Sequence, residues 1–134
     1  MTDTFRIFVH GKASSQGSKV AGRRRDGTLF TRPATKTERP WRQLLVDMIS
    51  EQWEGPPWQG PLELTLRFIF LRPQSDKHRV WHTPKPDIDK VLRAVMDALK
   101  LGGAIAKDEH VVSSSQVKVS GDIPGVEIEL RTLA

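Results

Sequence analysis

With 134 residues, the chain is long enough for one domain with a modest hydrophobic core, and its 37% hydrophobic and 28% charged residues are typical of a soluble globular protein. It has no cysteine, no apolar run of about 18 residues and no amino-terminal signal pattern, which excludes disulfides and thiolate metal sites and predicts a cytoplasmic protein without a membrane span. The net charge of +5 arises in residues 1–50, where ten Lys and Arg stand against four Asp and Glu. This imbalance favours a nucleic acid as the partner, although a merely soluble basic protein would share it.

The amino-terminal region predicts a strand and a basic loop. Apolar side chains alternate over residues 4–9, which is the pattern of a strand. Residues 11–27 are rich in Gly, Ser and cations, which predicts a flexible loop that ends in an Asp26–Gly27 turn before a short strand at 28–31. The cations of this loop are candidates for contact with DNA phosphates, and a solvated charged loop is the alternative. These cations are Lys12, Lys19, Arg23, Arg24 and Arg25.

The middle of the chain predicts one helix and one long strand. Apolar residues recur at helical spacing within residues 37–53, so we expect a helix with a core-facing stripe. Residues 62–71 alternate and then become apolar on both faces, which is typical of a central strand. The polar segment 72–86 follows as a loop, and its Lys85 is a further candidate for DNA contact.

The last third predicts a second helix and two strands. The helix is expected over residues 87–101, where a clean apolar stripe ends at a Gly-Gly pair, and the strands are expected over 110–120 and 125–133. The order β-β-α-β-α-β-β, with strands grouped at both ends, indicates an α+β fold. We therefore expect a single domain over residues 1–134, with two helices packed on a mixed sheet whose strand order stays open.

Three carboxylates flank the second predicted helix. Asp87 follows Pro86 directly and suits the N-cap, and Asp89 would complement the helix dipole without any catalytic role. Residues i and i+2 do not share a helical face, but Asp87 lies off the helix end, and the chain could fold back to bring Asp108 beside both. Three hard oxygen ligands would then suit Mg²⁺ or Mn²⁺, which can polarise a phosphoryl group and activate water.

Other polar side chains near this cluster have two interpretations. Arg93 lies four residues after Asp89 on the same helical face, so it would either form an ion pair with Asp89 or Asp97 or neutralise charge on a transition-state phosphate. The four histidines lack tight metal-ligand spacing, so we expect them at the surface or on DNA rather than on zinc.

The segment from Pro86 to Lys118 resembles the signature of the RusA-type Holliday junction resolvases, a family often encoded by phages and prophages. The matching positions are Pro86-Asp87-Ile88-Asp89, Arg93, Asp97-Ala98-Leu99, Asp108, Val111-Val112 and Lys118. The resemblance implies an α+β homodimer that cuts two symmetric strands of a four-way DNA junction with Mg²⁺ or Mn²⁺ and uses no small-molecule cofactor. It also implies that Asp87, Asp89 and Asp108 bind the metal, and it makes Lys118 a candidate for DNA contact.

The chain departs from the family signature at several positions. Arg93 stands where the signature has a catalytic Lys, and Lys90 stands where it has Asn, so either cation is a candidate to assist the carboxylates. Lys107 and His110 replace an Asp and a Gln of the later motif. The alternative function is a non-catalytic protein that binds branched DNA through the basic loop, with salt-dependent affinity to which the carboxylates add nothing. A purely structural or interaction domain would bind no DNA.

Overall fold

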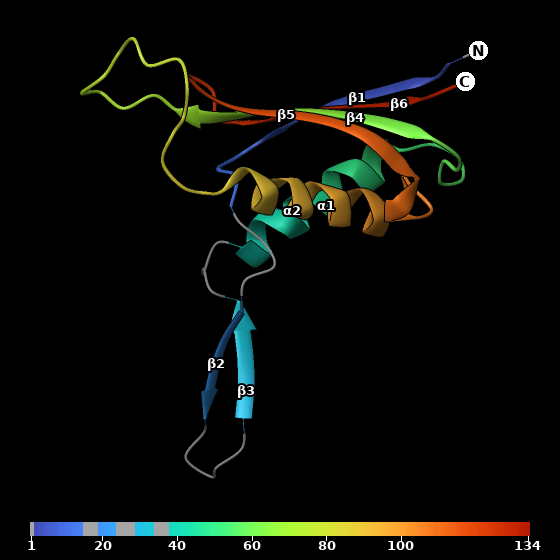
Figure 1. Ribbon diagram of the computed structural model, residues 1–134, viewed down its shortest axis with the longest axis horizontal. Coiled ribbons are helices and arrows are strands. Elements are labelled where there is room, and N and C mark those ends of the chain that lie inside the picture. Colours follow the sequence, from blue (N-terminus) through green and yellow to red (C-terminus); the bar gives the residue numbers. More distant parts are fainter. Residues whose placement is uncertain (1, 15–18, 24–28, 34–37) are drawn as a thin grey trace.

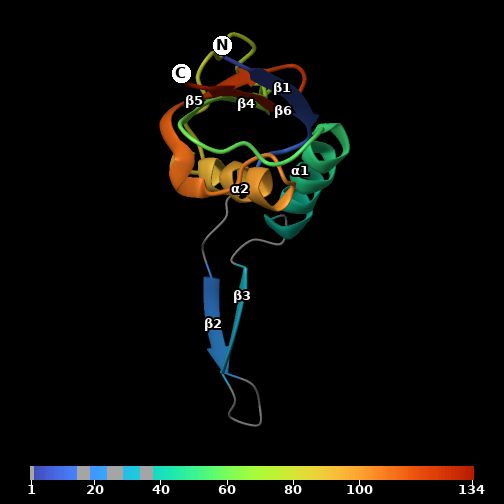
Figure 2. The ribbon, with the colours of Figure 1, turned by 90° about the vertical axis from the view of Figure 1, so that its right-hand side faces the viewer.

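The computed structural model describes residues 2–14, 19–23, 29–33 and 38–134. Its elements in chain order are β1 (Thr4–His10), β2 (Lys19–Arg23), β3 (Leu29–Pro33), α1 (Glu38–Gln52), β4 (Leu62–Leu71), α2 (Ile88–Leu101), the 3₁₀ helix η1 (Asp108–His110), β5 (Val111–Gly121) and β6 (Gly125–Thr132). Both α-helices pack on one face of a four-stranded sheet, and the opposite face of the sheet is open (Figures 1 and 2). This is the α+β architecture with two helices on a mixed sheet that the sequence predicts.

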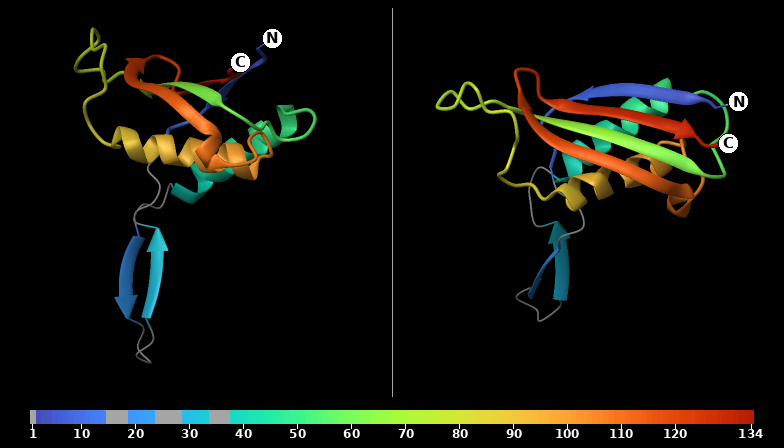
Figure 3. Two further views of the ribbon diagram at one scale, coloured as in Figure 1. Left: turned by 45° about the vertical axis from the view of Figure 1, so that its right-hand side comes forward. Right: turned by 45° about the horizontal axis from the view of Figure 1, so that its top comes forward.

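The main sheet has the strand order β1-β6-β4-β5, so the long apolar strand β4 is central, as its pattern predicts (Figure 3). Strand β4 pairs antiparallel with β6 and parallel with β5, and β1 pairs antiparallel with β6. The parallel pair β4 and β5 needs a crossover connection, and α2 supplies it. Strand β5 therefore lies at one edge of the sheet, next to the chain segment that leads into α2.

The hydrophobic core lies between the sheet and the two helices. The inward residues of β4, from Leu62 to Phe70, are all 4% exposed or less, and Val126, Ile128 and Leu130 of β6 are buried as their alternation predicts. Both predicted helical stripes face this core, and the buried residues of α2 are Val91, Ala94, Val95, Ala98 and Leu99. No helix in the described part of the chain is long and apolar enough to span a membrane.

The prediction of one continuous loop over residues 11–27 was wrong for residues 19–23. These residues form strand β2, which pairs antiparallel with β3 in a two-stranded sheet of its own. The hairpin projects away from the helical layer, on the side opposite the main sheet (Figures 1 and 2). A strand that pairs outside the core needs no buried face, so the apolar alternation by which strands are recognised is missing from its sequence.

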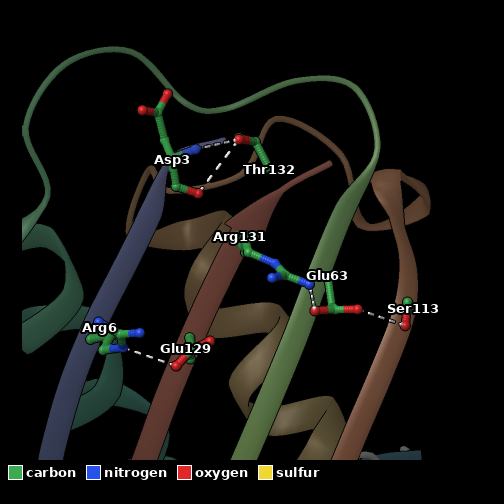
Figure 4. A network of polar contacts seen from close by, with 7 residues as sticks. All are labelled: Asp3, Arg6, Glu63, Ser113, Glu129, Arg131 and Thr132. Carbon is green, nitrogen blue, oxygen red and sulfur yellow. Dashed lines mark hydrogen bonds and ion pairs between the residues drawn. The ribbon is translucent and has the colours of Figure 1, made fainter. Parts of the chain in front are cut away.

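The open face of the sheet carries charged side chains that pair across strands. Arg6 of β1 donates to Glu129 of β6 at 2.9 Å, and Arg131 of β6 donates to Glu63 of β4 (Figure 4). The residues of each pair lie directly opposite one another in the strand register. Glu129 is therefore part of a cross-strand ion pair.

Candidate active site

An open hollow of about 400 Å³ lies beside α2 and gathers most of the predicted catalytic residues. Its lining residues are Asp89, Leu92, Arg93, Met96, Asp97 and Asp108. The hollow thus combines three carboxylates with one guanidinium over two apolar side chains. Asp89 and Asp108, which lie 19 positions apart in the sequence, share it as the interpretation of the carboxylate motif requires.

The charged side chains reach the hollow through the geometry of α2 and of the turn that follows it. Asp89, Arg93 and Asp97 are spaced by four residues, so they follow one face of the helix over about 12 Å, because each residue adds about 1.5 Å. After the helix ends, Gly103 adopts a φ of +86°, and the amide of Ala104 donates back to the carbonyl of Leu99 at 2.9 Å. This turn reverses the chain and sets Asp108, the first residue of η1, beside the helix.

Asp87 occupies the N-cap of α2 but does not line this hollow. Its backbone carbonyl accepts from the amides of Lys90 and Val91 at 3.1 and 3.2 Å, whereas its side chain makes no capping hydrogen bond. The simple structural interpretation of Asp87 as a side-chain N-cap therefore does not describe its carboxylate. Of the two candidate cations, Arg93 lines the hollow and Lys90 is not among the lining residues.

A second hollow, of about 370 Å³, lies near the start of α2 and brings together two of the predicted DNA-contacting lysines. It is lined by Lys12, Phe70, Leu71, His82, Lys85 and Pro124. The ring of His82 stacks on Phe70 with centroids 3.9 Å apart, and its Nε2 lies 3.0 Å from the carbonyl of Lys85. This contact anchors the segment before α2 and holds Lys85 near Lys12, although 73 positions separate the two lysines in the sequence.

Comparison with known protein families gives a match over most of the chain. A family model described as Endodeoxyribonuclease RusA matches residues 12–131 of the 134. The chain belongs to the RusA family. It is accordingly an endodeoxyribonuclease that hydrolyses DNA phosphodiester bonds, and its substrates are branched DNA junctions of the kind that arise in recombination. A comparison with proteins of curated function gives no significant match.

The donor chemistry of the hollow beside α2 suits a hard divalent cation. Asp89, Asp97 and Asp108 offer oxygen ligands, and the chain has no thiolate to compete with them. Among the described residues, no group of three or more His, Asp or Glu lies close enough together to hold a metal ion. Mg²⁺ does not require such a cage, because it is usually bound by one or two carboxylates together with waters and substrate phosphates. The residues of the hollow therefore fit Mg²⁺ chemically, and Asp89 and Asp108 are the two carboxylates that could bind it.

The remaining predicted DNA-contacting cations of this RusA protein have different surroundings. The ammonium of Lys118 donates to the carbonyls of Pro84 and Pro86 at 2.8 and 2.6 Å, so it is engaged within the protein. Lys19 and Arg23 belong to strand β2, whereas Arg24 and Arg25 lie outside the described residues. Their contact with DNA stays a prediction.

Asp97 is the charged residue of the hollow to which the sequence assigns no role in the site. In the sequence it stands only as a possible ion-pair partner for Arg93 and as part of the Asp97-Ala98-Leu99 match to the family signature. The signal was present, because Asp89, Arg93 and Asp97 recur every four residues on the face that the apolar stripe leaves open. A polar face on an amphipathic helix is ordinarily a solvated one, however, and only the return of Asp108 turns it into one wall of a hollow.

Proposed function

We propose that this protein resolves four-way DNA junctions by Mg²⁺- or Mn²⁺-dependent hydrolysis of one phosphodiester bond in each of two symmetric strands. The observation that carries the proposal is the shared hollow of Asp89 and Asp108, with Arg93 beside them, in a chain of the RusA family. Hydrolysis breaks a phosphorus–oxygen bond as water adds to phosphorus, so the site must neutralise growing negative charge on the phosphate oxygens. A carboxylate-held divalent cation beside a guanidinium meets that requirement.

Within this site, Asp89 and Asp108 would hold the metal ion, and Asp87 at the N-cap of α2 would complete the carboxylate set that the family signature implies. When bound, the ion polarises the scissile phosphate and favours attack by water. Arg93 donates to the phosphate oxygens, and its planar guanidinium can contact two of them at once. Arg93 does not serve as a general base, because a guanidinium remains protonated in proteins.

The DNA backbone is held by cations around the start of α2. Lys12 and Lys85 line one hollow, and Lys85 is only two residues from Asp87, so a phosphate bound there lies on the approach to the carboxylates. The cations of the hairpin segment, Lys19, Arg23, Arg24 and Arg25, extend this contact along the DNA. Such contacts position the enzyme on a junction without reading its sequence.

The protein acts as a homodimer located in the cytoplasm. A two-fold dimer presents one site to each of two equivalent strands, so both strands of a symmetric junction can be cut in one encounter. Light scattering coupled to gel filtration tests the dimer, which is expected to persist at the concentrations used for cleavage. A monomer that still cuts both strands of one junction without dissociating would contradict this arrangement.

The decisive experiment is cleavage of a synthetic four-way junction across a titration of Mg²⁺ and Mn²⁺. The intact protein is expected to cut the junction with either ion, to stop on addition of chelator and to leave a linear duplex of the same sequence uncut. Asp89→Asn and Asp108→Asn are expected to abolish cleavage and to retain junction binding, because each removes a metal ligand without removing a cation. Glu129→Gln, on the open sheet face, is the matched control and should cut normally. Binding without cleavage across several junction sequences and both ions would refute the proposal.

A further inference from the structure

We propose that Lys118 is a positioning residue that ties the start of α2, and with it Asp87, to the edge strand β5, rather than a contact to DNA. The ammonium of Lys118 donates to the carbonyl oxygens of Pro84 and Pro86, at 2.8 and 2.6 Å. Pro86 is followed immediately by Asp87, whose carbonyl accepts the first hydrogen bonds of α2. One side chain thus connects β5 to two prolines just before Asp87, the N-cap of α2.

The chain before α2 pairs with β5 and then loses the ability to continue this pairing. The amide of Ser120 donates to Val80 at 2.8 Å, the amide of His82 donates to Lys118 at 3.1 Å, and Trp81 forms an isolated antiparallel bridge with Val119. The next residues include Pro84 and Pro86, which have no amide hydrogen to donate. At this point the ammonium of Lys118 links the segment to β5 in place of backbone hydrogen bonds, because it can donate to both proline carbonyls.

The direction of the Lys118 side chain also argues against a role on DNA. Lys118 lies opposite Phe68 in the parallel register of β5 and β4, and the Phe68 side chain is fully buried on the helix-covered side of the sheet. Neighbouring residues in register point to the same face of a sheet, so Lys118 points toward the helices. Two of its three ammonium donors are used by Pro84 and Pro86, and hydrogen bonds from a charged donor are among the stronger ones in proteins.

The test compares Lys118→Met with Lys85→Met in the full-length protein. Methionine keeps most of the apolar stem of lysine and removes only the ammonium. In the protein without DNA, amide hydrogen exchange over residues 82–91 is expected to become about tenfold faster in Lys118→Met and to stay unchanged in Lys85→Met, with β6 as the internal reference. Unchanged exchange over residues 82–91 in Lys118→Met would overturn the proposal.

Junction binding provides a second readout, which rests on the proposed function. A lysine that contacts phosphate contributes about 0.9 to the slope of log affinity against log salt concentration. Lys85→Met is expected to lose that amount, whereas Lys118→Met should keep the wild-type slope and lose cleavage rate at saturating junction by tenfold or more. A slope reduced by about 0.9 in Lys118→Met would identify a DNA contact and overturn the proposal.

The two readouts separate the failure of this proposal from the failure of the proposed function. If the wild-type protein cuts no junction, the proposed function fails, whereas exchange in the free protein still decides the role of Lys118. Lys118→Arg covers the case in which the methionine variant does not fold, because arginine keeps a charged donor at the same position. In Lys118→Arg, amide exchange over residues 82–91 is expected to be closer to wild type than in any uncharged variant of Lys118 that folds. Exchange in Lys118→Arg as fast as in an uncharged variant would count against a role of Lys118 as hydrogen-bond donor.

Discussion

The two lysines of the second hollow give a quantitative prediction for DNA binding. Lys12 and Lys85 line one hollow of about 370 Å³ together with the apolar side chains of Phe70, Leu71 and Pro124, near the start of α2. If each neutralises one DNA phosphate, the double variant Lys12→Met/Lys85→Met lowers the salt slope of junction binding by about 1.8, twice the value for a single contact. When the salt concentration rises from about 50 to about 200 mM, the junction affinity of the wild type then falls by a factor about ten times larger than that of the double variant.

The assay is a fluorescence-anisotropy titration of a labelled four-way junction at several salt concentrations, without divalent cation so that no cleavage occurs. Each single variant should lower the slope by about 0.9. Arg6→Gln is the control, because it also removes one positive charge but lies on the open sheet face, paired with Glu129. A double variant with the wild-type slope, or a control that changes as much as the single variants, would refute the assignment of this hollow to the DNA backbone.

Three further predictions address the hollow beside α2 and the packing of that helix. Asp97→Asn should lower the cleavage rate by about tenfold or more with junction affinity retained, since its carboxylate borders the same hollow as Asp89 and Asp108, and Asp47→Asn on α1 is the control that should cut normally. Arg93→Gln should lower the single-turnover cleavage rate by about 10²-fold, as expected when a donor to the transition state is lost. Lys90→Gln should lower this rate far less. A larger loss in Lys90→Gln than in Arg93→Gln would assign the assisting cation to Lys90. Leu99→Ala removes a side chain that is 0% exposed between α2 and the sheet, so denaturant unfolding should show a loss of about 2–5 kcal/mol, and a loss below about 1 kcal/mol would contradict the packing of the helix.

The helices and strands with one buried face could be predicted from the sequence, because burial of one face requires apolar residues at regular spacing. The alternation in β4 and the stripe of α2 identify a central strand and a core-facing helix, and both are found with nearly the predicted bounds. Strand β2 shows no such spacing, since it pairs with β3 outside the core. The strand order depends on which strand edges pair, and the sequence pattern of one strand does not show which other strand lies beside it.

The candidate site was predictable in its residue types and only partly in its arrangement. Asp89 and Asp108 share a hollow as the carboxylate pattern suggests, whereas Asp87 stays at the N-cap and does not line it. The contribution of Asp97 depends on the turn at Gly103, which returns the chain to the exposed face of α2. The role of Lys118 could not be predicted from the sequence either. A lysine in a strand looks the same in the sequence whether its ammonium binds a DNA phosphate or a backbone carbonyl.

Strand β5 explains why the hollow can be held in shape although it is open to solvent. Its start receives η1 with Asp108, and Lys118, seven residues after Val111, reaches the start of α2. Seven strand residues span about 23 Å, and the 14 residues of α2 span about 21 Å, so β5 and the helix match in length between these two attachments. Lys118 thus ties the segment before α2 to β5, and the turn after Leu99 with η1 leads from the other end of α2 into the start of the same strand. Asp89, Arg93 and Asp97 on α2 share one hollow with Asp108 just before β5, so we expect that loosening either connection slows cleavage before it weakens DNA binding.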